Sequence, residues 1–192
     1  MCKLDNCNWR WSKDDEQRKE MEDTVLEAAR TLAKKLHEGQ TDKAGKDYFS
    51  VHLCTVAEKC VHWKEKVVGY LHDAAEDTEY SVEQVVQALK ARCGEQLCND
   101  DAKDIQDALE LLNSKTAASR AEYINRLCQN MTAVHVKMHD LKHNMDIRRI
   151  ENPTERDFER VERYKKEYEQ VYKAYSNVID ESIYKNQGTI LF

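Results

Sequence analysis

The sequence predicts an all-α protein that folds as one domain of about seven to nine helices. Only five glycines and one proline occur in 192 residues, so few positions interrupt a helix. Charged residues make up 34% of the chain, and apolar residues recur three and four positions apart, which is typical of amphipathic helices. No segment is rich enough in Gly, Ser or Pro to separate domains. We therefore expect a leader over 1–14, one helical domain over 15–180 and a tail over 181–192.

Eight helical segments follow from this pattern. The first carries an apolar stripe from Met21 to Leu36, and the polar segment 38–48, with its two glycines, ends it. Later boundaries have their own signals, since Ser81 begins a capping box and Gly94 is a helix stop. The third expected helix runs from about residue 63 through 71 into the stretch 69–81, before a turn at 78–80. The other expected helices are 15–37, 50–61, 81–93, 100–113, 119–129, 131–149 and 154–179.

Composition restricts the class of protein. No run of eighteen apolar residues occurs, so no membrane span is expected, and the first twenty residues lack the apolar core of a signal peptide. A net charge of -6 argues against a nucleic-acid-binding surface, which is normally basic. These features predict a cytoplasmic protein whose partner is a small molecule.

The seven cysteines are expected to be reduced, because a chain of this length needs no disulfide framework. Cys2 and Cys7 are five apart, as are Cys93 and Cys98. Neither pair combines the usual ligand spacing with a histidine partner. We therefore do not favour a structural zinc site.

The stretch GYLHDAAEDTEYS, residues 69–81, places four ionisable groups within about two helical turns. His72 and Glu76 are four apart, and so are Asp73 and Asp77, so each pair projects from neighbouring faces of one helix end. Solvated acids at a helix end are the alternative explanation, although acids at a C-terminus oppose the helix dipole.

Two other expected helices offer residues of the same kind. His52 lies among apolar or neutral residues, and Asp140 and Asn144 are four apart on the helix at 131–149. Two imidazoles and two carboxylates from three helices would form a mixed nitrogen and oxygen site suited to manganese, iron or zinc. Taken singly, each residue has an ordinary structural explanation, such as a hydrogen-bonded core histidine. His135 and His139 lie on another face and are interpreted as structural or peripheral.

Three segments resemble one family, in the same order. HEGQTDKAGKDYFSVHLCTVA, YLHDAAEDT and VKMHDLKHNMD are similar to motifs of the metal-dependent HD hydrolase domain of the RelA/SpoT alarmone enzymes and their stand-alone small relatives. The similarity covers about residues 30–149, and its most specific part is HD followed by two residues and Glu-Asp-Thr. The resemblance implies an HD-type helical bundle and an HD phosphohydrolase domain over 15–180.

The resemblance also implies roles for individual residues. Glu76 and Asp77 match the acidic pair that handles the attacking water. Lys43 matches a loop lysine near the substrate, and Asn144 matches the asparagine that contacts the nucleotide. The four metal ligands of the family, whose ion is usually manganese, correspond to His52, His72, Asp73 and Asp140.

The chain departs from the family at three places. Asp42 stands where the family's loop usually has arginine, and Leu141 replaces the arginine that commonly follows the last aspartate. The residue after His52 is leucine instead of proline, with an apparent one-residue insertion between Tyr48 and His52. Unless Asp42 points to solvent or to the edge of a base, we expect it to repel a substrate with several negative charges. The substitution Asp42→Arg should then improve kcat/KM.

The expected function is removal of diphosphate from the 3′ position of guanosine tetraphosphate by a metal-dependent phosphohydrolase without a synthetase domain. One alternative is an HD hydrolase of another nucleotide or phosphate ester. The other is a non-catalytic nucleotide-binding module on the same scaffold. Two carboxylates facing anionic phosphates favour the enzymes, because they weaken simple binding and suit acid–base chemistry.

Overall fold

The computed structural model describes residues 13–187, with side chains described up to residue 177. All regular elements of this part are helices, which confirms the all-α class and the expected number of helices. The α-helices are α1 (Lys13–Leu36), α2 (Cys54–Lys59), α3 (Trp63–Leu71), α4 (Ala74–Asp77), α5 (Val82–Cys93), α6 (Asn99–Leu112), α7 (Arg120–Leu127), α8 (Met131–Asn144) and α9 (Glu155–Gln187).

Helix α3 is the central element of the fold. It packs against α1, α2, α6 and α8, and most of its side chains are buried. Gly69 allows its close approach to α2, because a Cβ built on Gly69 would lie 2.8 Å from the Cα of Ala57. Helix α3 ends beside His72, so this contact also brings His72 towards the segment that carries His52.

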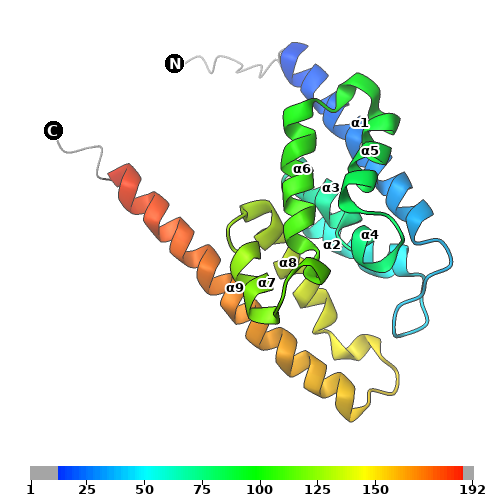
Figure 1. Ribbon diagram of the computed structural model, residues 1–192, viewed down its shortest axis with the longest axis vertical. Helices are drawn as coiled ribbons and strands as arrows, with labels where there is room; N and C mark the ends of the chain where they lie inside the picture. Colours follow the sequence, from blue (N-terminus) through cyan, green and yellow to red (C-terminus); the bar gives the residue numbers. More distant parts are fainter. Residues whose placement is uncertain (1–12, 188–192) are drawn as a thin grey trace, which may run out of the picture.

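The remaining helices surround α3 on two sides. Helices α1, α5 and α6 pack together on one side, and α8 packs against α9 on the other (Figure 1). Helix α9 contacts α7 and α8, while its C-terminal part extends away from the other helices (Figure 1). Val161, Glu167 and Val171 are its buried residues in the part whose side chains are described.

Three helix ends differ from the sequence expectation. The helix expected to run from 63 into the stretch 69–81 ends at Leu71, and Ala74–Asp77 forms the separate short helix α4. Helix α8 ends at Asn144 instead of at residue 149, and the chain continues into a 3-10 turn, Ile147–Arg149. The side chain of Asp146 caps that turn, so a new helical start replaces the expected continuation. Helix α9 continues to Gln187, past the expected boundary at 180, because no glycine or proline interrupts the sequence before Gly188.

The segment Phe49–Leu53 is a π-helix. A π-helical turn closes on the fifth residue instead of the fourth, so it holds one residue more than an α-helical turn. This turn lies where the sequence shows an apparent insertion between Tyr48 and His52. A turn of this width can accommodate such an extra residue, and the rings of Tyr48 and His52 have centroids 5.0 Å apart.

Two sequence expectations concern the ends of the chain and the cysteines. Within residues 13–187, no helix is long and apolar enough to cross a membrane. The five cysteines of this part are free. The pair Cys2 and Cys7, and almost all of the leader expected at 1–14, lie outside the described residues.

Candidate metal centre

His52 and His72 face each other in the interior of the protein. His52 comes from the π-helical turn and His72 from the end of α3, and both are buried. Their Nε2 atoms are 3.3 Å apart. His72 donates from Nδ1 to the carbonyl oxygen of Gly69 at 2.8 Å, and Nδ1 of His52 lies 2.7 Å from Nδ1 of His143. The bond to Gly69 leaves Nε2 of the neutral His72 ring as an acceptor, and Nε2 of His52 is an acceptor when Nδ1 of His52 donates to His143.

Two carboxylates complete this group. Asp73 Oδ2 lies 3.3 Å from Nε2 of His52 and 3.0 Å from Nε2 of His72. Asp140 Oδ1 lies 3.4 Å and 3.9 Å from the same two atoms. His52, His72 and Asp140 offer ligand atoms within 4.8 Å of one another, the only such set in the described part of the chain. The fold thus brings together four residues singled out from three separate segments.

The arrangement favours positive charge at its centre. Burial lowers the pKa of His72, but the carboxylates of Asp73 and Asp140 outweigh burial and raise that pKa to about 9. Burial likewise opposes ionisation of Asp73, yet His72 and His52 hold its pKa well below the usual value. The ligand atoms of His52, His72 and Asp140, with Asp73 Oδ2 beside both imidazoles, form a mixed nitrogen and oxygen set that fits a divalent transition-metal ion. These four residues would hold it.

Three side chains hold the carboxylates of this group in place. Tyr48 donates its hydroxyl to Asp73 Oδ2 at 2.6 Å. Lys137 donates to Asp140 Oδ2 at 2.7 Å, and Asn144 donates to Asp140 Oδ1 at 2.5 Å. We expected Asn144 to contact the substrate, and Tyr48 and Lys137 were not among the predicted site residues. Lys137 and Asn144 lie about one turn before and after Asp140, which is the sequence signal for such contacts.

Three of these four residues, His52, Asp73 and Asp140, line a cavity of about 340 Å³, within the size range of small-ligand sites. His72 is not part of its wall and lies behind His52 and Asp73. The other sequence-predicted site residues, Lys43, Glu76, Asp77 and Asn144, also line the cavity. Burial and the nearby charge of Arg160 lower the pKa of Lys43. Six carboxylates and five cationic side chains line the cavity, and the cationic ones are Lys43, Arg120, Lys137, Arg149 and Arg160.

Glu76 and Asp77 follow the metal group on the short helix α4. One carboxylate oxygen of Glu76 accepts from the backbone N–H of Ser114 at 2.5 Å, and Lys115 donates to the Glu76 carbonyl oxygen. Burial, followed by the negative charge of Asp73, raises the pKa of Asp77. A raised carboxyl pKa favours proton acceptance, so this pair suits acid–base chemistry beside the metal group.

Asp42 is held inside the loop and does not present a free negative charge. Its Oδ1 accepts from the backbone N–H groups of Ala44 at 2.9 Å and Lys46 at 3.0 Å. Its side chain is 3% exposed, and Oδ2 lies 3.5 Å from a guanidinium nitrogen of Arg149. Arg149 therefore places a cation next to Asp42. This pairing removes the basis for expecting Asp42 to repel an anionic substrate.

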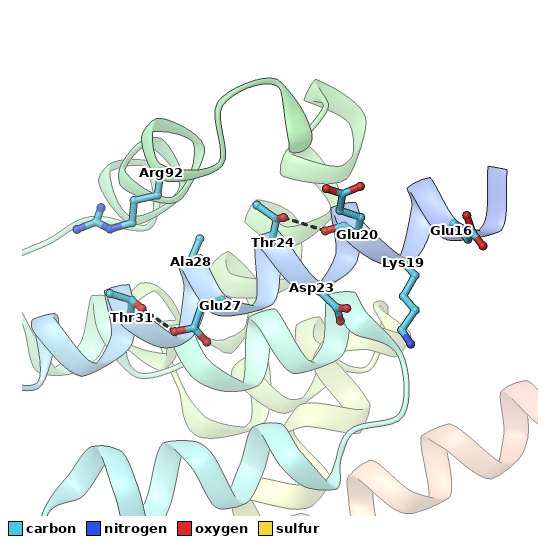
Figure 2. A pocket seen from close by; sticks show the side chains of 9 residues that line it. All are labelled: Glu16, Lys19, Glu20, Asp23, Thr24, Glu27, Ala28, Thr31 and Arg92. Atoms are coloured by element: carbon cyan, nitrogen blue, oxygen red, sulfur yellow. Dashed lines mark hydrogen bonds between the residues drawn. The ribbon is translucent and has the colours of Figure 1, made fainter. Parts of the chain in front are cut away.

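A wider hollow of about 870 Å³ lies along α1, with Arg92 of α5 on its far side (Figure 2). Its lining contains no histidine and is rich in acids from the outward face of α1. Thr24 and Thr31 bond to the residues four positions earlier in the same helix. These are features of a solvated helix face, so the chemistry points to the smaller cavity.

Comparisons with known proteins assign no family to the chain. No protein-family model matches it, and no curated protein matches it significantly. The likeness to the RelA/SpoT hydrolase domain therefore rests on the sequence motifs alone.

Proposed function

We propose that this chain is a metal-dependent phosphohydrolase that acts on a nucleotide. Guanosine 3′,5′-bis(diphosphate) is the first candidate substrate, and manganese is the first candidate ion. The main support is that Glu76 and Asp77 share one cavity with His52, Asp73 and Asp140, and that His72 contacts His52 and Asp73. Five cationic side chains in the same wall suit a ligand with several phosphates.

The protein groups divide the proposed chemistry between them. A divalent ion held by the four-residue group would lower the pKa of a water and offset charge on the phosphoryl oxygens. Glu76 keeps one oxygen on Ser114 and uses the other to accept a proton from the water that attacks the 3′ phosphorus. The bond from phosphorus to the 3′ oxygen breaks, diphosphate leaves, and the accepted proton returns to that oxygen. Asp77, with its raised pKa, supports proton transfer from the neighbouring position.

Lys43 and Arg160 would hold the phosphates not being cleaved. Both line the cavity and lie close enough for Arg160 to lower the pKa of Lys43. Two cations so close together repel each other, and a phosphate between them relieves that repulsion. This pair accounts for a polyphosphorylated substrate more readily than for a simple phosphate ester.

A hydrolase of another nucleotide remains the second candidate, because Asp42 and Leu141 stand where the resembled family has arginines. The non-catalytic alternative is disfavoured by Glu76 and Asp77, whose charges would weaken the binding of phosphates without contributing to a binding module.

The decisive experiment is a turnover assay on a panel of nucleotides that includes guanosine tetraphosphate, with and without Mn²⁺. We expect Mn²⁺-dependent release of diphosphate. Glu76→Gln should lower kcat by roughly 10²-fold, the scale for losing a general base, while Mn²⁺ binding is kept. Glu79→Gln is the matched control, since Glu79 is exposed and lies outside the cavity. Absence of turnover with every nucleotide, or full activity of Glu76→Gln, would refute the proposal.

A further inference from the structure

A second cavity, of about 360 Å³, lies between the start of α3, the outward side of α8 and α9. It shares no lining residue with the cavity of the first metal group. Three of the seven histidines of the chain line it, together with a buried glutamate: His62, His135, His139 and Glu65. Such a concentration of imidazole groups in one hollow needs a physical explanation beyond a solvated surface.

Glu65 fixes the orientation of His135. Glu65 Oε1 lies 2.5 Å from Nδ1 of His135, and its other oxygen accepts from the backbone N–H groups of Val61 and His62. An ionised carboxylate only accepts hydrogen bonds, so Nδ1 of His135 carries the hydrogen, and Nε2 of the neutral ring keeps its lone pair. Metal-binding histidines are commonly oriented by a carboxylate in this way.

His139 lies four residues after His135, one turn further along the same side of α8. Two histidines at this spacing on a helix are a recurring pair of metal ligands. The Nδ1 atom of His139 is buried and has no hydrogen-bond partner among the described residues. A buried polar atom without a partner is costly, and a bound cation would remove that cost.

His62 supplies a third imidazole from the other side of the cavity. It is the N-cap residue of α3 and is exposed. The ligand atoms of His52, His72 and Asp140 lie within 4.8 Å of one another, and no other set in the described part of the chain does so. The ligand atoms of His62, His135 and His139 are therefore further apart. Rotation of His62 and His139 towards Nε2 of His135 would close the site.

We propose that His62, His135 and His139 form a second metal site, which takes a divalent ion of the zinc, nickel or copper class. Imidazole ligands suit these ions, whereas the mixed carboxylate and imidazole group of the first cavity also suits manganese. The ion would join the start of α3 to α8, with Glu65 as the partner that orients His135. The inference does not depend on the proposed function, since it concerns other residues.

The test is Zn²⁺ stoichiometry, measured by equilibrium dialysis and mass spectrometry on the tag-free, metal-stripped full chain. His139→Ala and His62→Ala leave the Glu65–His135 contact in place, and His52→Ala removes a ligand of the first group instead. We expect His139→Ala and His62→Ala each to bind one ion fewer than the wild type, or to weaken that ion by at least about tenfold. Circular dichroism checks that each variant is folded.

A double variant tests whether the two metal sites bind their ions independently. His52→Ala with His139→Ala should lose both ions if the two sites are independent. A stoichiometry that is unchanged in both His62→Ala and His139→Ala would overturn the second site. A third outcome is that His62→Ala and His139→Ala each lose an ion while His52→Ala binds as many ions as the wild type. That result would support the second site and refute the metal centre on which the proposed hydrolase depends.

Discussion

The hydroxyl of Tyr48 is expected to contribute to metal affinity through Asp73. Tyr48→Phe removes this hydroxyl and keeps the ring, whose centroid is 5.0 Å from that of His52 and 5.5 Å from that of His37. Burial and the charge of Asp73 raise the pKa of Tyr48 far above its usual value, so the hydroxyl stays protonated and donates. The change therefore deletes one hydrogen bond and little else.

The magnitude follows from the 2.6 Å contact with an ionised carboxylate. A hydrogen bond to a charged group contributes about 1.5–3 kcal/mol, which corresponds to roughly 10- to 150-fold in a binding constant. Asp73 keeps its contacts with both His52 and His72, so the lower part of this range applies. We expect Mn²⁺ affinity to fall by about 10- to 30-fold, in line with the usual effect of residues that support metal ligands.

The assay is a Mn²⁺ titration in which the concentration of free Mn²⁺ is measured from its electron paramagnetic resonance signal. Tyr70→Phe is the matched control, because Tyr70 is also buried but lies outside the cavity. The melting temperatures of the two metal-free variants should be compared, so that a general loss of stability is recognised. Mn²⁺ affinity of Tyr48→Phe within twofold of the wild type would refute the supporting role of this hydroxyl.

Two further substitutions test the packing and the loop. Gly69→Ala should lower stability by about 1–3 kcal/mol in chemical denaturation and weaken Mn²⁺ binding, because its Cβ would meet Ala57 at 2.8 Å; unchanged stability would contradict the proposed close approach. Asp42→Arg should lower both stability and kcat/KM, because it removes the acceptor for two backbone N–H groups and places a second cation beside Arg149. An increase in kcat/KM would restore the view that Asp42 repels the substrate.

The sequence predicted the helices well because each depends on local information. Apolar spacing, the cap at Ser81 and the stop at Gly94 act within a few residues, and the structure has α5 between these two positions. The group of candidate ligands was also predictable, since His72 and Asp73 are adjacent and the resemblance named the other two. Periodicity alone shows on which face of its own helix a residue lies. It does not show which faces of two different helices pack against each other.

The long-range contacts could not be derived in this way. Tyr48 and Asp73 are 25 residues apart, and His52 and His143 are 91 residues apart. No local pattern connects either pair. Likewise, the partner of Asp42 is Arg149, which follows a helix end that periodicity placed five residues too late. The expectation that Asp42 repels an anionic substrate was made without its partner Arg149, whose positive charge lies beside it.

The π-helical turn at Phe49–Leu53 has a consequence for the evolution of this protein. An extra residue in an ordinary α-helix would turn every preceding side chain by about 100° relative to those that follow. Here one wide turn absorbs that rotation, so the chain can gain a residue while Tyr48 still reaches Asp73. An alignment with the family that the motifs resemble would therefore need a gap inside this helix. Without that gap, Val51 would be aligned with the histidine of that family.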